Sequence, residues 1–299
     1  MLEQFGKSVP IDVIVSCRNQ IGEGPIWLED QQRIVWVDIT QHLIQWFDPV
    51  SGTVEVLDVG KDVGAVAPTT SGGLVAALPG EFVLISHPGR DIRTVGRFEE
   101  NKPNNRMNDG KCDSLGRFWA GTMAYDLETS AAALYRLNTD CTVDVMVAPV
   151  TLSNGIGWSP DNRLMYYVDS PTQSVDMFDY ESTTGTLRNR RTFVQIPKEA
   201  GLPDGLTVDA DGYVWVALWE GGALWRLAQN GQLDMILELP VSQVTSCTFG
   251  GSDLSDLYIT SAATGLSETR RRAEPQAGNL FRCEPGPRGL PAHCFAGCQ

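Results

Sequence analysis

The chain has 299 residues, of which 37 are acidic and 23 are basic, so its formal net charge is −14. A surface this negative repels phosphate backbones and anionic lipids, which argues against nucleic-acid and membrane partners. Hydrophobic residues make up 42% of the chain, enough for a packed core, but no run of 18 apolar residues is present. The acidity fits a site that holds a cation, although a solvated acidic surface is the simpler explanation of the charge taken alone.

The N-terminus and the cysteines bear on the cellular compartment. The sequence MLEQFGKSVPIDVIVSC lacks an apolar stretch with a small-residue cleavage site, so a cytoplasmic protein is expected. Seven cysteines are scattered along the chain without a CxxC pair, which excludes a zinc knuckle or a thioredoxin-like motif. Cys294 and Cys298 lie in a Pro/Gly-rich tail that begins at about residue 284, and they could pair in an oxidising compartment. Reduced thiols are the simpler interpretation.

One short pattern recurs along the chain: an apolar strand, a polar turn rich in Asp, Gly or Asn, and a second strand with aromatic and β-branched residues. The six copies span residues 24–39, 67–85, 110–123, 155–170, 205–219 and 247–262. They begin roughly 40 to 50 residues apart, which is the period of a four-stranded propeller blade.

Several copies are followed by a second hairpin pattern, at residues 43–57, 133–147, 175–193 and 223–237. Two hairpins per repeat give a four-stranded blade. The copy at 67–85 is the weakest, because Pro79 and Gly80 fall at its hairpin. The strand at 10–17 has no hairpin partner, so we expect it to join the last blade around 279–286 and close the ring.

The helical period of i, i+3, i+4 and i+7 is missing from the sequence. Residues 126–137 contain good helix formers but lead into a strand, so a loop or short turn is expected there. The sequence therefore predicts an all-β fold. It is a single six-bladed β-propeller domain over residues 1–299, with four-stranded blades around a central channel and a ring closed by the N-terminal strand.

Aligning the copies brings polar residues to one equivalent position, just before the first strand of each blade. These are Glu23, Asn108, Asn154 and Asp204, with Thr245 and Ser246 in the sixth copy, whereas the second copy offers only residues 64–68. The first strand of each blade lines the channel, so these side chains should converge at one mouth of the channel. Two carboxylates and two amides at one point require a cation, and their oxygens suit a hard divalent ion such as calcium.

Each single motif is weak evidence for such a site. Pro203-Asp204-Gly205 and Asn154-Gly155 are equally typical of β-turns, and Glu23 between glycines could be an ordinary loop residue. The agreement in register across blades is what favours a site.

Other chemistries lack their usual residues. The three histidines, His42, His87 and His293, are far apart in sequence, which leaves a His-rich zinc site or a Ser-His-Asp triad incomplete. No Walker-type or Rossmann-type phosphate loop occurs. Glu23 and Asp204 could form a glycosidase pair, but a carboxylate committed to a metal is a poor general acid.

At these residues the sequence resembles the gluconolactonase, regucalcin and senescence-marker-protein family. The resemblance runs from about residue 17 to about residue 281, in order and at family spacing. It rests on IGEGPIW, NNRMNDGKCDSLGRFWAGTM, LSNGIGWSPDNRLMYYVDS, GLPDGLTVDADGYVWVALWEGGALWRL and TSCTFGGSDLSDLYITSA, which together are far more specific than any one triplet.

The resemblance implies a six-bladed propeller that hydrolyses sugar lactones with one catalytic divalent metal. The implied metal ligands are Glu23, Asn154 and Asp204, and the ion is calcium, zinc, manganese or magnesium. Arg106 and Asn108 would hold the substrate, with Asp126 as a further contact. One departure is clear: animal members carry Glu-Glu after GTMA, where this chain has Tyr125-Asp126. The choice of substrate is therefore less determined than the reaction.

The hypothesis for mechanism is that the metal polarises the lactone carbonyl and Asp204 acts as the general base toward water. Arg106 would fix sugar hydroxyls by a forked hydrogen bond. Two other functions stay open: a calcium-binding or protein-interaction propeller without catalysis, and a metal-dependent esterase or phosphoesterase. The polar cluster argues against a pure interaction platform. The oligomeric state is left undetermined.

Overall fold

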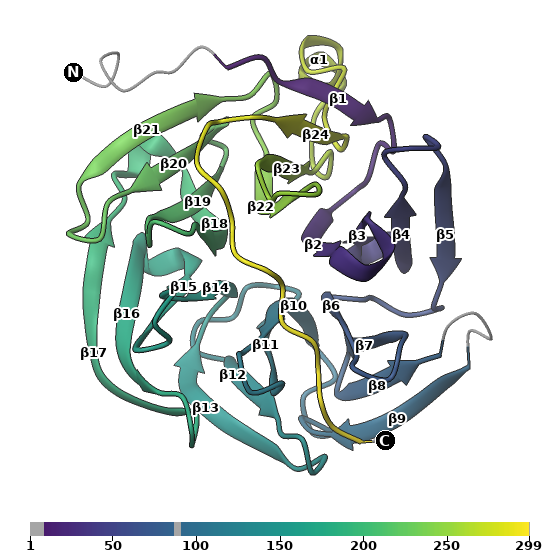
Figure 1. Cartoon of the computed structure of the whole chain (residues 1–299), viewed down its shortest axis with the longest axis vertical. Helices are drawn as coiled ribbons and strands as arrows, with labels where there is room; N and C mark the ends of the chain where they lie inside the picture. The colour runs from purple at the N-terminus through teal and green to yellow at the C-terminus, as the bar shows by residue number, and fades with distance from the viewer. Residues whose placement is uncertain (1–8, 87–90, 299) are drawn as a thin grey trace.

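The structure, a computed structural model, describes residues 9–86 and 91–298 and shows six four-stranded antiparallel sheets arranged as a ring (Figure 1). This confirms the predicted six-bladed propeller. His87 lies outside the described residues.

The first three blades follow one another along the chain. Blade 1 contains β2 (Gly22–Leu28), β3 (Arg33–Asp38), β4 (Leu43–Phe47) and β5 (Val54–Asp58). Blade 2 contains β6 (Ala65–Pro68), β7 (Leu74–Leu78), β8 (Glu81–Ile85) and β9 (Ile92–Arg97). Blade 3 contains β10 (Asn105–Cys112), β11 (Phe118–Ala124), β12 (Ala132–Leu137) and β13 (Val143–Val150).

The second half of the ring repeats this order and ends with a blade built from both ends of the chain. Blade 4 contains β14 (Ser153–Trp158), β15 (Leu164–Asp169), β16 (Ser174–Glu181) and β17 (Thr186–Gln195). Blade 5 contains β18 (Leu202–Val208), β19 (Val214–Trp219), β20 (Ala223–Leu227) and β21 (Leu233–Glu238). Blade 6 contains β22 (Val244–Gly250), β23 (Asp256–Ser261), β24 (Leu280–Cys283) and β1 (Asp12–Val15).

Ring closure follows the prediction. The N-terminal strand β1 pairs antiparallel with β24, and Asp12 lies opposite Arg282. The two ends of the chain thus share one sheet, which leaves no gap between the first and last blades.

Helical structure is minor. Within residues 9–86 and 91–298 the single α-helix is α1 (Glu268–Ala273), and 3-10 turns occur at Glu29–Gln31, Ile39–Gln41, Ser170–Thr172 and Lys198–Ala200. As expected, the segment that precedes β12 is a loop rather than a helix. None of the described helices has the length and apolar character needed to cross a membrane.

The core lies between the blades. Strands such as β11 and β19 are buried on both faces, because each blade packs against a neighbour on either side. Trp36, Trp119 and Trp215 on second strands are completely buried. Trp119 contacts Trp158 of blade 4, and Trp215 contacts Phe249 of blade 6, so these side chains pack between neighbouring blades.

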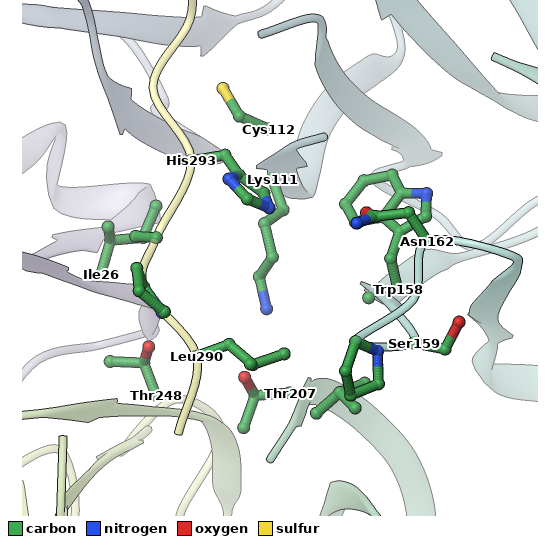
Figure 2. A pocket seen from close by; sticks show the side chains of 15 residues that line it. Ile26, Lys111, Cys112, Trp158, Ser159, Asn162, Thr207, Thr248, Leu290 and His293 are labelled. Carbon is green, nitrogen blue, oxygen red and sulfur yellow. The ribbon is translucent and has the colours of Figure 1, made fainter. Parts of the chain in front are cut away.

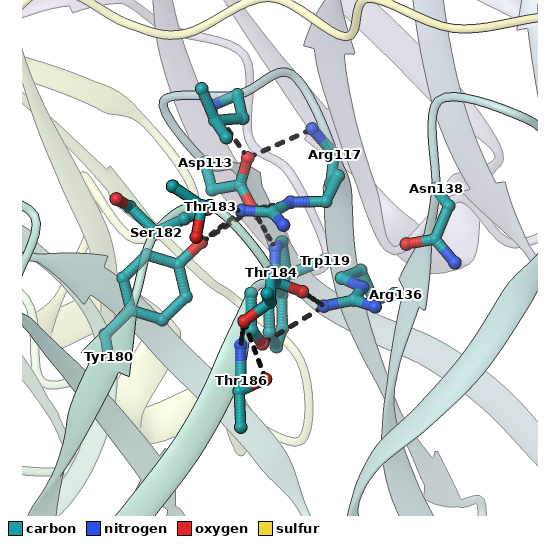
Figure 3. A network of polar contacts seen from close by, with 12 residues as sticks. Asp113, Arg117, Trp119, Arg136, Asn138, Tyr180, Ser182, Thr183, Thr184 and Thr186 are labelled. Carbon is teal, nitrogen blue, oxygen red and sulfur yellow. Dashed lines mark hydrogen bonds and ion pairs between the residues drawn. The ribbon is translucent and has the colours of Figure 1, made fainter.

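A buried aspartate anchors the packing at two of the blades. Asp113 Oδ2 accepts hydrogen bonds from Arg117 Nε at 2.6 Å, Trp119 Nε1 at 2.8 Å and the Tyr180 hydroxyl at 2.8 Å, which joins blade 3 to blade 4 (Figure 3). Blade 5 repeats the motif with the same Asp-to-Trp spacing, since Asp209 accepts from Trp215 Nε1 at 2.9 Å. The repeat is thus visible in side-chain chemistry as well as in strand order.

The C-terminal segment, residues 284–298, forms a strap that crosses one face of the ring over the central channel (Figure 1, yellow). It is tied down along its length, because the Gly289 amide donates to Leu254 O at 2.8 Å and the Phe295 amide donates to Pro68 O at 2.7 Å. Phe295 is completely buried. The strap therefore runs from blade 6 to the opposite side of the ring.

The cysteine pairing differs from both sequence interpretations. Cys298 forms a disulfide with Cys141, in the turn between β12 and β13, and Cys294 is free. A Cys294–Cys298 pair is therefore wrong, and so is a fully reduced tail. The physical reason is the path of the strap, which brings Cys298 next to Cys141. The Cys298 amide donates a hydrogen bond to Thr139 O at 3.2 Å, two residues before Cys141.

Candidate active site

The predicted site residues lie within the innermost strands rather than before them, which corrects one detail of the sequence analysis. Glu23 is in β2, Arg106 and Asn108 are in β10, Asn154 is in β14 and Asp204 is in β18. All five are buried near the start of their strands. The inner strands therefore bring them to one end of the channel, which we call the near mouth.

A shift in strand pairing accompanies these residues. The register between first and second strands shifts between Glu23 and Ile26, Met107 and Gly110, Ser153 and Ile156, Pro203 and Leu206, and Val244 and Ser246. Such bulges break the strict alternation of side chains and re-aim them, and they are common beside active sites. The four blades with the predicted polar residues all have this irregularity at those residues.

The dipeptides that resemble turns have a different role here. Asn154-Gly155 and Asp204-Gly205 lie inside strands, and their glycines allow neighbouring blades to approach closely. A Cβ atom on Gly155 would lie 2.6 Å from the carbonyl oxygen of Asp204, and one on Gly205 would collide with Ser246. Any larger residue would push the inner strands apart, so the turn interpretation is wrong at both positions.

The two predicted metal-ligating carboxylates are buried with like charges around them. Glu23 is 2% exposed and Asp204 is 6% exposed. Burial, followed by the negative charges of Asp204 and Asp109, raises the pKa of Glu23 well above its ordinary value. Burial and Asp109 do the same to the pKa of Asp204. The near mouth thus holds carboxylates that bind either protons or a cation.

Asn154 supplies the sharpest sign of a cation site. Its Nδ2 donates to Ser170 Oγ at 3.0 Å, and Ser170 Oγ donates in turn to Pro203 O at 2.7 Å. Because the Ser170 proton is already used, Asn154 must present its nitrogen to Ser170. Asn154 Oδ1 is consequently buried without a hydrogen-bond partner. A buried carbonyl oxygen left in this state is costly, and a cation would satisfy it.

The candidate metal ligands at the near mouth combine carboxylate oxygens with an amide oxygen. Within the described parts of the chain, no three His, Cys, Asp or Glu side chains lie together as a metal site. A cation at the near mouth would therefore need the amide oxygen of Asn154 beside the carboxylates of Glu23 and Asp204. Carboxylate and amide oxygens are the ligands of hard divalent ions.

The two predicted substrate-binding residues on β10 are held together. Arg106 Nη1 donates to Asn108 Oδ1 and to Met107 O, both at 2.8 Å, and Asn108 Nδ2 donates to Ser153 O at 2.9 Å. Burial lowers the pKa of Arg106, and the nearby charge of Asp62 opposes that effect. These two bonds hold the guanidinium group in one orientation.

Asp126 lies apart from the buried cluster. It is exposed just beyond β11, and its Oδ1 accepts a hydrogen bond from Asn104 Nδ2 at 2.9 Å. The preceding residue, Tyr125, instead donates its hydroxyl to Asp62 Oδ2 at 2.6 Å, and Asp62 Oδ1 is 3.1 Å from His42 Nε2. Burial and Asp62 raise the pKa of Tyr125 to about 12. The rim around Arg106 thus consists of Tyr125, Asp62 and His42.

Sequence reasoning missed Asp109, Lys111 and Asp62. Asp109 follows Asn108 directly, and simple alternation would place two consecutive side chains on opposite faces of the strand. The register shift after Met107 removes that restriction. The charge of Asp109 raises the pKa of both Glu23 and Asp204, so it belongs to the same electrostatic cluster.

The fold and the site together define a six-bladed propeller with an oxygen-donor site at one mouth of its channel. Residues 21–263 match the family model described as SMP-30/Gluconolactonase/LRE-like region. The chain therefore belongs to the SMP-30/gluconolactonase family.

Individual relatives extend over nearly the whole chain. Regucalcin of Danio rerio is 39% identical over 294 residues, which cover 97% of this chain and 99% of the relative. A calcium-binding protein, regucalcin, from Agrobacterium tumefaciens has a similar structure, with a TM-score of 0.93, 26% identity and coverage of 96% and 97% of the two chains. A luciferin-regenerating enzyme has a TM-score of 0.91 with 29% identity, over 97% of this chain and all of the other.

Proposed function

We propose that the protein hydrolyses a sugar lactone, gluconolactone or a related aldonolactone, to the aldonic acid with the help of one divalent cation. Glu23, Asn154 and Asp204 would hold the cation, with calcium expected first and zinc, manganese or magnesium as alternatives. Membership of a gluconolactonase-type family supports the reaction class. The observation that carries the cation site is the buried, unpartnered Asn154 Oδ1 beside two buried carboxylates.

A bound divalent cation would supply Lewis-acid polarisation of the lactone carbonyl, which disperses the negative charge that develops on its oxygen. Two buried acids with raised pKa values suit this role, because a cation that replaces their protons also removes their mutual repulsion. The similar protein from Agrobacterium tumefaciens is described as calcium-binding, which agrees with an oxygen-only donor set.

Asp204 is the proposed general base. Its carboxylate would take a proton from the attacking water, whose oxygen forms a bond to the carbonyl carbon. The ring C–O bond then breaks, and the released alkoxide takes the proton from Asp204. The carboxyl product ionises at neutral pH, so one lactone and one water yield one aldonate and one proton.

Arg106 and Asn108 would orient the sugar. The guanidinium group has donors beyond the two bonds it makes to Met107 and Asn108, and these can fork across adjacent hydroxyls. Asp126 remains a proposed substrate contact at the exposed rim. Tyr125 lies at the same rim, and its hydroxyl donates to Asp62 Oδ2 at 2.6 Å.

The test is acid release from glucono-, galactono- and xylonolactone by chelator-treated protein, with each of the four metals added back. Turnover restored by a metal on one lactone supports the proposal and names the substrate. Asp204→Ala should lose nearly all turnover and remain folded, whereas Asp140→Ala, which removes an exposed aspartate far from the channel, should retain it. Wild-type activity in Asp204→Ala would show that Asp204 is not the base.

A calcium-binding protein without catalysis is the second candidate, and the description of the Agrobacterium tumefaciens relative favours it. Calorimetry separates the two. Calcium binding that is lost in Asn154→Leu, with no turnover of any lactone, would support binding alone. Aryl acetate and phosphomonoester substrates in the same assay cover the esterase and phosphoesterase alternatives. The proposed partner is a small molecule, and a cytoplasmic location stays a prediction.

A further inference from the structure

A cavity lies at the end of the channel opposite to the near mouth, and we call this end the far mouth. Its volume is about 180 Å³, and Figure 2 shows the residues that line it. Ile26, Trp158 and Val208 form part of its wall and come later in the inner strands than the near-mouth residues. An apolar cavity of about 150 Å³ accommodates benzene, so this one has room for a small organic molecule.

The strap forms the outer wall of this cavity. Residues 290–293 line it from the outside, and Leu290 is 36% exposed. The strap crosses the ring as a single extended chain (Figure 1). The cavity beneath it is partly open to solvent. A ligand could therefore enter from the face opposite to the candidate active site.

Lys111 extends into the middle of this cavity (Figure 2). Its ammonium group donates to Leu206 O at 2.9 Å, and it forms no ion pair with any residue that the structure describes. An ammonium group has three donors, so two remain available. The lining contains no carboxylate, and its polar atoms include the hydroxyls of Thr207 and Thr248.

The carboxylates that act on Lys111 come from the near-mouth side. Burial lowers the pKa of Lys111, and the negative charges of Asp109, two residues earlier on β10, and of Glu23 oppose that effect. One oxygen of Asp109 already accepts from the Gly110 amide at 2.7 Å. These acids partly offset the effect of burial without forming an ion pair with Lys111, so two of its donors remain available at the cavity.

We propose that the far-mouth cavity binds a small monocarboxylate with an apolar body. The carboxylate would accept hydrogen bonds from Lys111 and from the Thr207 and Thr248 hydroxyls. The apolar body would lie against Trp158 and Leu290. A single cation matches one carboxylate, and the apolar walls favour an aliphatic or aromatic acid over a polyhydroxylated one.

The experiment uses the full chain after chelator treatment, with sodium benzoate as the probe and benzamide as its neutral counterpart of similar shape. Calorimetric titration should show saturable binding of benzoate at one site. Benzamide should bind at least about tenfold more weakly, because charge-assisted hydrogen bonds are roughly twice as strong as neutral ones. This comparison needs no variant, so it does not depend on the folding of one.

Two variants then locate the site. Lys111→Met keeps the chain length and removes the charge, and it should weaken benzoate binding by about tenfold or more. Lys61→Met, at an exposed lysine outside the channel, is the matched control and should bind as the wild type does. Leu290→Trp should block the cavity from the strap side and abolish binding, while a ligand at the near mouth would be unaffected.

Equal affinity for benzoate and benzamide would overturn the proposal, and so would the absence of saturable binding. Benzoate binding that persists in Leu290→Trp would place the ligand elsewhere and would also overturn it. Failure here leaves the proposed lactonase untouched, because that function depends on residues at the other end of the channel.

Discussion

Replacing Asp113 with alanine should be among the most destabilising changes in the chain. The carboxylate is completely buried and accepts from Arg117, Trp119 and Tyr180 (Figure 3). Asp113 is the one ion-pair partner of Arg117 among the described residues, and the Arg117 side chain is 8% exposed. Removing the Asp113 carboxylate leaves the buried guanidinium of Arg117 without a counter-charge, which should lower the free energy of unfolding by about 3–5 kcal/mol.

Blade 5 contains a matched comparison. Asp209 accepts from Trp215 and Arg226 and is also completely buried. Arg226, however, also contacts Asp234 at 2.7 Å and Asp211 at 3.3 Å. Asp209→Ala therefore leaves the guanidinium paired and removes mainly hydrogen bonds, at a cost of about 2 kcal/mol.

Urea unfolding of both variants and the wild type in one buffer measures the difference. A chain of this length should lose about 2 °C of melting temperature per kcal/mol, so scanning calorimetry gives a second reading. The free energy of unfolding of Asp113→Ala should be lower than that of Asp209→Ala by about 2 kcal/mol. If Asp209→Ala were as damaging as Asp113→Ala, the additional carboxylates around Arg226 would have no compensating effect and the reasoning would fail.

The remaining predictions concern metal, pH and the strap. Because the folded-state pKa values of Glu23 and Asp204 are raised, their contribution to stability is present below about pH 4 and is lost as pH rises through the raised values. Chelator-treated protein should thus melt at a lower temperature as pH rises, and a pH-independent melting temperature would contradict this. Calcium at about 100 times its Kd should raise the free energy of unfolding by about 2.7 kcal/mol. Cys141→Ser should lower the free energy of unfolding by about 2–4 kcal/mol, because it opens the link to Cys298. The free thiol variant Cys294→Ser should stay within about 0.5 kcal/mol of the wild type in the same urea titration.

The ring of blades was predictable from sequence because each blade repeats the same local pattern. Alternating apolar residues around polar turns specify hairpins locally, and the period of the copies specifies how many hairpins there are. Closure by β1 could also be predicted, since a strand without a hairpin partner needs an edge to pair with. The gathering of Glu23, Asn154 and Asp204 at one mouth of the channel was predictable for the same reason, because they occupy one position of the repeat.

What the sequence did not reveal depends on contacts without a local signal. The register shift in β10 brings Asp109 to the acidic cluster, and its one sequence sign is Gly110, a residue type that is typical of turns as well as of bulges. The Cys141–Cys298 disulfide joins residues 157 positions apart, and only the path of the strap brings them together. Lys111 resembles an ordinary strand lysine until the strap is placed over the channel.

The charges inside the channel link the two proposed sites. Glu23, Asp109 and Asp204 are negative and Arg106 and Lys111 are positive, so the fully ionised channel carries one excess negative charge. At a pH above the raised pKa values of Glu23 and Asp204, a divalent cation at the near mouth changes this to one excess positive charge. An anion at the far mouth then meets less repulsion from the three acids. Cation and monocarboxylate should therefore bind with positive coupling, and by linkage each should raise the affinity of the other by the same factor.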